Sequence, residues 1–342
     1  MFMSISTALA PARMTPWPSF QGYTSVQPGQ AGTYNHQPSP AAAPPHTMHE
    51  ITAIVLTHNE SIHLRRCLSA LQQVAARICV VDSFSSDDTE QIAREMGADF
   101  FQNPWKNHAT QFNWALNHCN VSTPWVMRVD ADEYPEPALV ASIKAFVQNP
   151  GPCNAALLKR KIVFLGQPIK HGFFYPSLNL RLWRTGQGEV EQRWMDEHVV
   201  VQNACTRVLE GDLADENLND LSWWSSKHVG YAMREVYDIV ASEQARDSAD
   251  AGPRPSGPAR LKRWVKAHVY SRLPGGLRGL LYFLYRYVLG MGFLDGKAGF
   301  YFHFLQAFWY RVLVDANLYE LQKQARDRKT TPLALLKERG VL

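Results

Sequence analysis

The sequence predicts an α/β fold, with a mostly parallel, twisted sheet that carries helices on both faces, followed by a helical C-terminal region. Short apolar runs alternate with helical periods from residue 51 onward, which is the pattern of parallel strands joined by crossover helices. The alternation stops near residue 221, where longer helical periods begin. A chain of 342 residues, of which 46% are apolar and 19% charged, is long enough for one large core or for a core and a smaller domain.

The chain divides into three parts by composition. Residues 1–48 contain no Asp or Glu and are rich in Pro, Ala, Gln, Ser and Gly. Such a segment cannot bury enough apolar surface to offset the entropy lost on ordering, so we predict a disordered, low-complexity tail. Residues 49–220 hold the alternating pattern and are predicted to form the α/β domain, and residues 221–342 are predicted to form the helical region.

Charge and cysteine content argue against several classes of protein. The net charge of +4 and the isoelectric point near 8.7 are mild, so charge alone does not favour a nucleic-acid partner. The five cysteines are widely spaced and form no C-x-x-C pair, which favours reduced thiols over a disulfide framework or a zinc site. The sequence also lacks the G-x-x-x-x-G-K motif, which excludes a P-loop enzyme.

The first half of the α/β domain repeats a strand followed by a helix. Apolar runs predict strands at residues 51–57, 78–82, 98–101 and 125–130. Helical periods predict helices at residues 62–71, 89–97 and 108–118. The serines and acids before Thr89 are good N-cap residues, and Gly97 is expected to end the second of these helices.

The second half of the α/β domain shows three further patterns. An amphipathic helix is expected from Pro135 to Val147, and a strand that begins at Ala155 is expected to run into a turn at Gly166. Residues 178–186 alternate apolar with basic side chains, which is typical of a half-buried strand. The alternation leaves open which of Arg181 and Arg184 faces the cleft.

Three acidic residues follow successive long strands. Glu60, Asp82 and Asp130 each fall where a strand is expected to end. Ligands of parallel sheets bind outside the carboxyl ends of the strands, so we expect these acids to gather at one crevice. Carboxylates that converge without a cation repel each other, so a positively charged or hydrogen-bond-donating ligand is expected between them.

Asp130 and Asp132 form a D-x-D pair directly after an apolar run. Side chains one residue apart at a strand end point to the same side. Two such carboxylates suit Mg²⁺ or Mn²⁺ that is also held by the phosphates of a substrate, because hard cations prefer oxygen ligands. A nucleotide with its metal ion therefore fits these acids. The alternative is an acidic turn that caps the helix beginning at Glu136.

Three motifs together resemble a known enzyme family. They are T-H-N-E at residues 57–60, V-D-S-F-S-S-D-D-T at residues 81–89 and D-A-D-E at residues 130–133. In order and spacing they resemble the inverting family 2 glycosyltransferases of the GT-A fold, a Rossmann-like architecture. The resemblance is strongest to the bacterial branch of lipopolysaccharide-core β-glucosyltransferases and exopolysaccharide sugar transferases, and it covers about residues 50–205.

This resemblance implies roles for individual residues. Binding of a nucleotide-sugar donor is implied for Thr57, Asn59, Glu60, Asp82 and Asp130. Binding of Mg²⁺ or Mn²⁺ is implied for Asp130 and Asp132. Gln111 and Asn113 stand where related enzymes turn a polar helix face toward the donor sugar and diphosphate. The alternative for these two residues is a solvated helix face.

The segment RWMDEHVVV, residues 193–201, is a second acidic cluster in an apolar setting. Inversion requires a base that deprotonates the acceptor hydroxyl, and the resemblance places it here, with Glu197 as first choice and Asp196 as second. Partial desolvation beside Trp194 would raise the basicity of either carboxylate. His198 is expected to orient the base or to complete the metal site. The alternative is a capped turn that enters the strand HVVV.

The C-terminal region combines basic residues with dense aromatics between residues 260 and 315. Arg286, His303 and Arg311 interrupt its apolar runs, so none reaches the ~20 residues that a spanning helix requires. The pattern favours helices that lie in the interface of an anionic membrane, with Trp and Tyr at headgroup depth. The alternative is a helical packing domain whose aromatics form an ordinary core.

These observations predict an inverting glycosyltransferase that moves a sugar from a nucleotide diphosphate, with UDP expected, to a lipid-linked glycan in bacterial envelope polysaccharide synthesis. The expected location is cytoplasmic, peripheral on the inner face of the cytoplasmic membrane. A sugar nucleotidyltransferase would require a Gly-rich basic loop after the first strand, which residues 58–61 do not supply. A membrane-docked nucleotide-binding scaffold without turnover stays as an alternative. A nucleic-acid partner is disfavoured because the basic residues are interleaved with bulky apolar ones.

Overall fold

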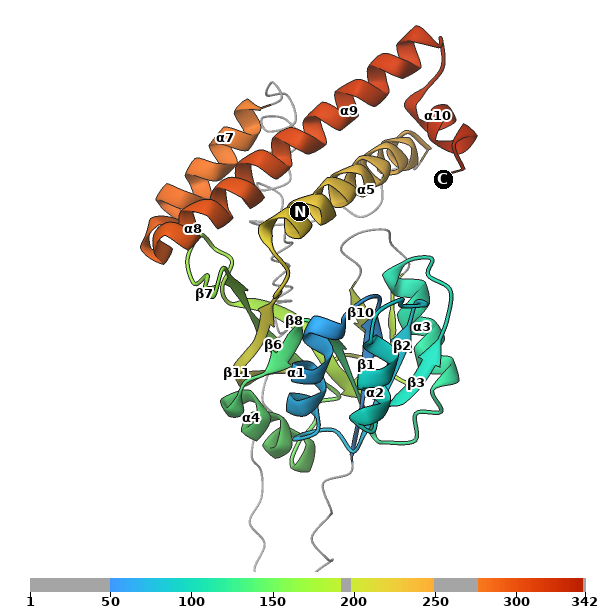
Figure 1. Ribbon diagram of the computed structural model, residues 1–342, viewed down its shortest axis with the longest axis vertical. Helices are drawn as coiled ribbons and strands as arrows, with labels where there is room; N and C mark the ends of the chain where they lie inside the picture. The colour runs from blue at the N-terminus through green and yellow to red at the C-terminus, as the bar shows by residue number, and fades with distance from the viewer. Residues whose placement is uncertain (1–49, 192–197, 249–275, 341–342) are drawn as a thin grey trace, which may run out of the picture. The chain divides into compact units, whose positions relative to one another are not determined.

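The structure is a computed structural model that describes residues 50–191, 198–248 and 276–340. The predicted tail over residues 1–48 lies outside the described residues. These described residues belong to one compact unit. The described helices and strands are shown in Figure 1.

The first half of the sheet is parallel. Its strands stand in the order β3-β2-β1-β4, and each pair of neighbours runs in the same direction. Their bounds are β1 (Ile51–Thr57), β2 (Arg77–Asp82), β3 (Asp99–Gln102) and β4 (Trp125–Asp130). The carboxyl ends of these strands therefore share one edge of the sheet.

The second half of the sheet is mixed and continues beyond β4 in the order β8-β6-β11-β5. Strand β8 runs antiparallel to both β4 and β6, whereas β6 and β11 run parallel. The bounds are β5 (Glu133–Pro135), β6 (Ala155–Phe164), β7 (Gln167–Pro168), β8 (Ser177–Arg184) and β11 (Thr206–Glu216). A separate two-stranded sheet consists of β9 (Gly188–Val190) and β10 (Val199–Val201).

Helices cover both faces of the large sheet. Their bounds are α1 (Ser61–Leu71), α2 (Thr89–Glu95), α3 (His108–His118) and α4 (Pro137–Gln148). Side chains of α1, α2 and α4 pack with Ala53 and Val55 in one buried cluster, while α3 packs with Ile54 in another. Successive residues of a strand point to opposite faces, so β1 is buried on both sides. The predicted α/β class with helices on both faces is confirmed.

Local sequence explains where several helices begin and end. The side chain of Asn107 caps α3 by accepting a hydrogen bond of 2.7 Å from the backbone N–H of Thr110. Pro137 stands in the first turn of α4, where its missing N–H costs nothing. Gly97 follows α2 with φ of +73°, a left-handed conformation that glycine adopts without strain.

The C-terminal region is helical, as predicted. Its elements are α5 (Leu221–Ser248), α7 (Leu277–Leu284), η2 (Tyr285–Leu289), η3 (Gly292–Asp295), α8 (Gly296–His303), η4 (Phe304–Trp309), α9 (Tyr310–Asp327) and α10 (Pro332–Glu338). Helices α5 and α9 run alongside each other (Figure 1) and share a buried cluster that includes Val236 and Val314. Within the described residues, no helix combines the length and the hydropathy needed to cross a bilayer.

The helical region is fastened to the loop between β7 and β8. The carboxylate of Asp295 accepts hydrogen bonds from the backbone N–H and the ring of His171, at 2.9 and 2.6 Å. Arg286 donates to the carbonyl of Gly172 at 2.7 Å. The backbones of Gly172 and Gly290 approach so closely that a Cβ on Gly290 would lie 2.7 Å from the Cα of Gly172. This contact therefore requires glycine at position 290.

Candidate active site

Strand register places the predicted acids at one edge of the sheet. Thr57 pairs with Asp82 across β1 and β2, and Leu56 pairs with Asp130 across β1 and β4. The last residues of three adjacent parallel strands therefore stand side by side. We call the six residues at this edge the strand-end site: Thr57, Asn59, Glu60, Asp82, Asp130 and Asp132.

Asp82 is fully buried and organises the loop that follows β2. Its carboxylate accepts hydrogen bonds from the hydroxyl of Thr57 at 2.9 Å, from the backbone N–H of Ser85 at 2.7 Å and from the hydroxyl of Ser85. A carboxylate has about four acceptor positions, so one is left for a further donor. Asp82 thus joins the ends of β1 and β2 and fixes the course of the loop.

Asn59 and Phe84 both adopt left-handed backbone conformations beside Asp82, with φ of +56° and +57°. The side chain of Asn59 accepts from the backbone N–H of Ser86 at 2.8 Å, and asparagine tolerates this conformation well. Phe84 does not, because a bulky side chain at positive φ is strained. Its ring is 56% exposed at the edge of the strand-end site.

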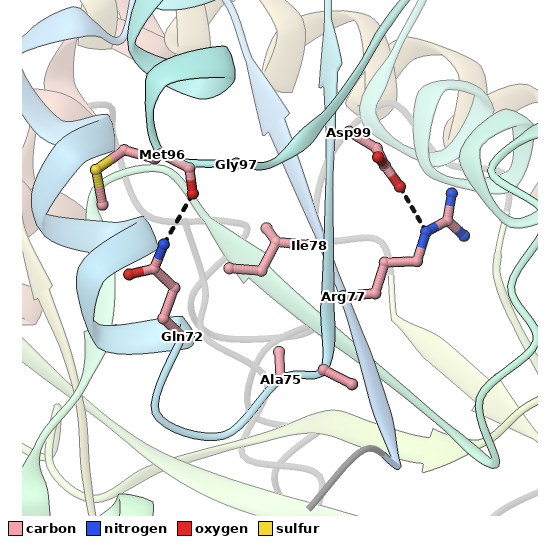
Figure 2. A pocket seen from close by; sticks show the side chains of 8 residues that line it. Gln72, Ala75, Arg77, Ile78, Met96, Gly97 and Asp99 are labelled. Carbon is pink, nitrogen blue, oxygen red and sulfur yellow. Dashed lines mark hydrogen bonds and ion pairs between the residues drawn. The ribbon is translucent and has the colours of Figure 1, made fainter.

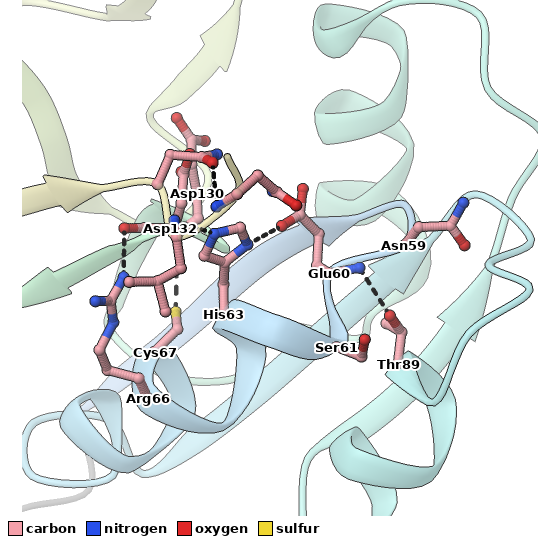
Figure 3. Close-up of polar contacts among 12 residues, drawn as sticks. Asn59, Glu60, Ser61, His63, Arg66, Cys67, Thr89, Asp130 and Asp132 are labelled. Atoms are coloured by element: carbon pink, nitrogen blue, oxygen red, sulfur yellow. Dashed lines mark hydrogen bonds and ion pairs between the residues drawn. The ribbon is translucent and has the colours of Figure 1, made fainter. Parts of the chain in front are cut away.

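Glu60 is oriented by a buried histidine, as Figure 3 shows. The Nδ1 of His63 lies 2.6 Å from the carboxylate of Glu60, and its Nε2 accepts from the backbone N–H of Leu218 at 2.8 Å. Since Nε2 is the acceptor, the ring proton stands on Nδ1 and points at Glu60. The backbone N–H of Glu60 donates to the hydroxyl of Thr89 at 2.9 Å. Hydrogen bonds therefore fix both the backbone N–H and the side-chain carboxylate of Glu60.

Asp130 lies between two arginines at the end of β4. Arg181 donates to its carboxylate at 3.1 Å, and Arg128 stands 3.7 Å away. Partial burial alone would raise the pKa of Asp130, but the two guanidinium groups outweigh it and hold the pKa well below its usual range. Asp130 is therefore ionised at neutral pH.

Glu133 is the buried neighbour of Asp130. It is 1% exposed, accepts from Arg181 at 2.6 Å and also accepts from the backbone N–H of Asp130 at 3.1 Å. Burial raises its pKa to about 8, against the opposing pull of Arg181 and with the help of the Asp130 charge. The acids after β4 thus separate into an ionised Asp130 and a Glu133 that retains its proton near neutral pH.

Asp132 stands in the turn between β4 and β5, where the period of two no longer applies. Its carboxylate accepts one hydrogen bond of 3.2 Å from the amide of Asn217. Its backbone carbonyl accepts from the N–H of Glu216 at 3.1 Å and from Arg66 at 3.5 Å. The turn is therefore held from the end of β11 and from α1, and the Asp132 carboxylate keeps unused acceptor positions.

The residues present fit a divalent ion only in part. Carboxylate oxygens suit Mg²⁺ or Mn²⁺, and Asp132 is less committed to protein partners than Asp130. Among the residues that the structure describes, no three His, Cys, Asp or Glu side chains are grouped to hold a metal. An ion at Asp132 would draw its remaining ligands from water and from the phosphates of a bound nucleotide, as Mg²⁺ commonly does.

The α3 candidates are both held by protein contacts. Gln111 is fully buried, which rules out the solvated alternative for it, and its amide donates to Ser83 and to the carbonyl of Asn103, both at 3.1 Å. Asn113 bonds both backbone groups of Val190, at 2.7 and 2.9 Å. Gln111 thus supports the loop after β2, and Asn113 fastens β9 to α3.

The predicted base lies outside the described residues, since Asp196 and Glu197 fall within residues 192–197. His198, the next described residue, is exposed, and its backbone N–H donates to Glu191 at 3.3 Å. The strand expected after it is present as β10. The roles of Asp196, Glu197 and His198 stay predictions.

Sequence reasoning did not identify the partners that hold the acids. These partners are His63, Arg66, Arg181, Asn217 and the buried acid Glu133. The alternation of residues 178–186 indicated a half-buried strand but left open whether Arg181 or Arg184 faces the acids. The structure answers this: Arg181 is buried against Asp130, whereas the Arg184 guanidinium lies 4.1 Å from the Trp125 ring.

A small cavity lies at the opposite edge of the sheet and does not belong to this site. It has a volume of about 260 Å³ and opens between the start of β2, the end of α1 and the turn after α2 (Figure 2). Gln72 bonds the carbonyl of Met96 at 2.8 Å there, and Arg77 pairs with Asp99 at 2.5 Å. Its lining carboxylate, Asp99, is the first residue of β3 and so lies at the amino end of a strand.

Comparisons with known proteins match this region of the chain. Residues 52–206 match the model of "Glycosyl transferase family 2". An uncharacterized glycosyltransferase of Rickettsia felis is 34% identical over 86 residues, which cover 25% of this chain and 30% of that protein. The lipopolysaccharide core biosynthesis glycosyltransferase LpsC of Rhizobium meliloti is 27% identical over 146 residues, which cover 41% of this chain and 53% of LpsC. The matches thus span between about a third and about half of these relatives.

Among solved structures, the mannosyltransferase PcManGT of Pyrobaculum calidifontis, in complex with GDP-Man and Mn²⁺, is similar with a TM-score of 0.43 and 14% identity. The similarity covers 83% of this chain and 90% of that one. The family match begins within β1 and ends at the start of β11, so it contains all six residues of the strand-end site. Residues 52–206 of this chain are therefore similar to glycosyltransferase family 2.

Proposed function

We propose that the protein is an inverting glycosyltransferase that uses a nucleotide diphosphate sugar, with UDP expected, and Mg²⁺ or Mn²⁺. The observation that carries the proposal is the alignment of Thr57, Asp82 and Asp130 at one sheet edge, within residues that match a glycosyltransferase family model. Ligands bind at this edge of parallel sheets. The names of the relatives, one of which is assigned to lipopolysaccharide core biosynthesis, agree with this activity.

In this proposal the loop after β2 receives the nucleoside. The exposed ring of Phe84 offers a face on which a base can stack, and stacking on an aromatic ring contributes about 1–3 kcal/mol per base. Asp82 keeps one acceptor position for a donor on the base, and Glu60, fixed by His63, is placed to accept from the ribose. The rigid support of these groups lowers the entropy cost of binding.

The diphosphate would lie toward the D-x-D turn, with Asp132 as the principal metal ligand and Asp130 as the second acid. A bound divalent ion supplies positive charge to the departing diphosphate, which is a large part of catalysis in such transfers. Arg66 and Asn217 keep the turn in place. Arg181 and Arg128 hold Asp130 ionised and oriented.

The transfer itself is a displacement at the anomeric carbon of the donor sugar. The acceptor hydroxyl oxygen bonds to that carbon while the bond from the carbon to the diphosphate oxygen breaks, and the nucleoside diphosphate leaves with that electron pair. The hydroxyl proton passes to a carboxylate on the opposite side of the sugar, a role that we assign to Glu197, with Asp196 as second choice. His198 would orient this base or add a metal ligand.

The acceptor is proposed to be a lipid-linked glycan, because the helical region exposes many large apolar side chains. We call this set the apolar surface: Leu277, Leu280, Leu281, Leu284, Tyr285, Val288, Leu289, Met291, Phe293, Leu294, Phe300, Tyr301 and Phe304, with Phe173 from the loop between β7 and β8. Leu289 is 70% exposed and Leu294 is 55% exposed. A group of many exposed large apolar side chains marks an interaction site, since monomeric soluble proteins rarely expose large apolar patches.

A bilayer surface is the occupant that this composition favours. The spacing of Leu277, Leu281, Leu284 and Val288 places one apolar stripe along α7 and η2, and Tyr285 stacks on Phe173 at 4.9 Å. The only charged side chains between residues 277 and 289, Arg278 and Arg286, are held inward by Asp315 and by Gly172. Each inserted Leu or Phe contributes about 1.5–3 kcal/mol. We therefore place the protein on the inner face of the cytoplasmic membrane.

A donor screen tests the proposed function. The purified protein is heated with a panel of nucleotide diphosphate sugars, with and without MnCl₂, and its melting temperature is recorded. A donor that binds the native state at 100 times its Kd stabilises it by about 2.7 kcal/mol. We expect one nucleotide class to raise the melting temperature in the presence of Mn²⁺ only. No stabilisation by any donor would contradict the proposal.

Hydrolysis separates turnover from simple binding. The donor found in the screen is incubated with the protein without acceptor, and released nucleoside diphosphate is measured. A transferase is expected to release it slowly, with water in place of the acceptor hydroxyl, and faster when a lipid-linked glycan is added. Binding without release under both conditions would favour the scaffold that lacks turnover.

A further inference from the structure

Helix α5 presents a basic and aromatic face beside the strand-end site. Trp223, Lys227 and Tyr231 are spaced four residues apart and so share one face of the helix. The Nζ of Lys227 lies 4.5 Å from the centre of the Trp223 ring and 5.9 Å from the centre of the Tyr231 ring. Trp223 is 37% exposed, so this face is open to a ligand. The helix lies beyond the family match, which ends at residue 206.

An adjacent face of α5, about 100° around the helix, fixes the rotation of the helix. Trp224 and His228 stack at 3.6 Å, and Trp224 also contacts Phe164 with ring centres 5.7 Å apart. The Nε2 of His228 lies 2.8 Å from the Gln306 amide of η4. These contacts lie in the interior, because His228 is only 7% exposed. The direction of the Lys227 face is therefore set by packing on the adjacent face of the helix.

The connection into α5 is tied to the same acids. Asn217 donates to the carboxylate of Asp132 at 3.2 Å, and the N–H of Leu218 donates to His63, which holds Glu60. Helix α5 begins at Leu221, directly after this connection (Figure 1). Displacement of the start of α5 would thus disturb both Asp132 and Glu60.

Lys227 carries a positive charge that these acids stabilise. Burial alone would lower its pKa, but Tyr231, Asp132 and Glu60 outweigh it and raise the pKa above its usual value. Its ammonium group is therefore charged at neutral pH. Its contacts in the described part of the chain are with the two rings, and no carboxylate there lies within 4.0 Å of it.

We propose that the Lys227 ammonium, held between Trp223 and Tyr231 beside Asp132 and Glu60, binds a phosphate group of a substrate. A nucleoside diphosphate brings about two to three negative charges to an edge already occupied by carboxylates, and one divalent ion offsets two of them. Arg128 and Arg181 are turned toward Asp130 and Glu133. Lys227 supplies the additional cation from outside the α/β domain.

The proposal rests on the proposed function and deepens it, since it assigns a phosphate subsite to the helical region. The phosphate has two sources with the same chemistry: the diphosphate of the donor, or a diphosphate that links the acceptor glycan to its lipid. A lysine ammonium binds either as a point charge. If it binds the donor, it also stabilises the charge that develops on the departing diphosphate.

The test compares Lys227→Ala and Lys227→Arg with Lys323→Ala, a control at an exposed lysine of α9. Calorimetry measures binding of UDP, of inorganic pyrophosphate and of uridine, each with MnCl₂. We expect Lys227→Ala to weaken UDP and pyrophosphate binding about tenfold, the scale of one charge-assisted contact, while uridine binding and the melting temperature stay unchanged. Lys227→Arg should restore most of the affinity.

The acceptor arm uses the same variants in steady-state transfer with a glycan on a lipid diphosphate. Unchanged UDP affinity with a tenfold higher KM for this acceptor would assign the phosphate to the acceptor and support the subsite. Equal UDP affinity, pyrophosphate affinity and acceptor KM in Lys227→Ala and Lys323→Ala would overturn it. If the unaltered protein still transfers sugar in that case, the proposed function stands without the subsite. If the unaltered protein shows no transfer but Lys227→Ala binds pyrophosphate more weakly, the phosphate subsite stands and the proposed function is contradicted.

Discussion

The strand-end site and the apolar surface differ in how their side chains are satisfied. At the strand-end site nearly every polar group already has a protein partner: Asp82 has three donors, Asp130 has two arginines and Glu60 has His63. On the apolar surface, side chains such as Leu289 and Leu294 lie more than half exposed. The first region is rigidly organised for a charged ligand, and the second has large side chains that nothing in the chain's described part covers.

Because one region is polar and the other apolar, the two regions can bind different ligands without competing for the same interactions. Electrostatic complementarity and pre-positioned hydrogen bonds give specificity for a small charged molecule. Apolar area gives non-directional attraction that scales with the surface removed from water. The contacts around Gly172 and Asp295 join the regions, so membrane attachment would hold the strand-end site close to a lipid-linked substrate.

The largest effect is expected at the metal carboxylate. Asp132→Asn removes the negative charge but keeps the hydrogen bond from Asn217 possible, so the fold should persist while transfer falls about 1,000-fold, the scale of lost charge stabilisation. Single-turnover assays with the donor found in the screen measure it. Asp99→Asn, at the opposite edge of the sheet, serves as the control. Transfer by Asp132→Asn within threefold of the control would remove Asp132 from the mechanism.

Loss of Arg181 should affect folding as strongly as activity. Arg181→Met leaves Glu133 and Asp130 without their main partner, and breaking a buried ion pair from one side costs about 3–5 kcal/mol. Guanidinium unfolding monitored by circular dichroism gives the value. The double variant Arg181→Met with Asp130→Asn should recover part of the loss, because the ionised carboxylate that lost its arginine is then neutral. No recovery would show that Arg181 acts through some other contact.

Charges on the apolar surface should release the protein from membranes. The double variant Leu284→Glu and Leu289→Glu removes two insertable side chains and adds two charges, so partitioning onto anionic vesicles should fall about 100-fold. Vesicle sedimentation measures it. Val208→Glu alters an exposed apolar residue of β11 and should bind vesicles like the unaltered protein. Equal partitioning of both variants would mean that the apolar surface does not face lipid.

The smallest effect is a pH dependence of stability. The pKa of Glu133, about 8 when folded, exceeds the value of about 4.3 for an unfolded glutamate. The folded state therefore binds the extra proton between these values, and this stabilisation is lost as pH rises toward and through 8. We expect a loss of about 2 kcal/mol between pH 5 and pH 8.5, after allowance for the coupling to Asp130. Chemical unfolding of Glu133→Gln should show a flatter profile, and an unchanged slope would contradict the assignment.

Strong local patterns explain which elements the sequence predicts well. The helix predicted over residues 108–118 is α3 with the same bounds, because Asn107 caps its first turn and apolar residues recur with helical spacing. The strand expected over residues 125–130 is β4, likewise with the same bounds. In both segments the local signal and the tertiary contacts favour the same structure.

Strand β11 was not predicted, and its sequence explains why. It contains Gly211 at φ of +84° and several acids, and its pairing with β6 shifts register between Val208 and Asp212. The acids have long-range partners: Asp212 accepts from Tyr175 at 2.8 Å, and Asp215 pairs with Arg160 at 3.3 Å. Polar residues that are satisfied only by distant partners erase the alternation on which strand prediction depends.

The strand-end site likewise contains residues that the sequence could predict and residues that it could not. The acids at the strand ends could be predicted because parallel strands bring their carboxyl ends together whatever the connecting helices contain. Arg181 could not be assigned, because its position depends on the antiparallel register that pairs Met127 with Leu182 across β4 and β8. Asn217 and His63 also join segments far apart in sequence. Local patterns contain no information on such pairings.

Diffraction from crystals soaked with UDP and MnCl₂, recorded at the manganese absorption edge, tests the central claim most directly. A manganese peak is expected within bonding distance of an Asp132 carboxylate oxygen and of the UDP phosphates, with the uridine against the loop that carries Phe84. A nucleotide bound elsewhere, or a manganese ion remote from Asp132, would contradict the claim that these strand-end acids form the donor site.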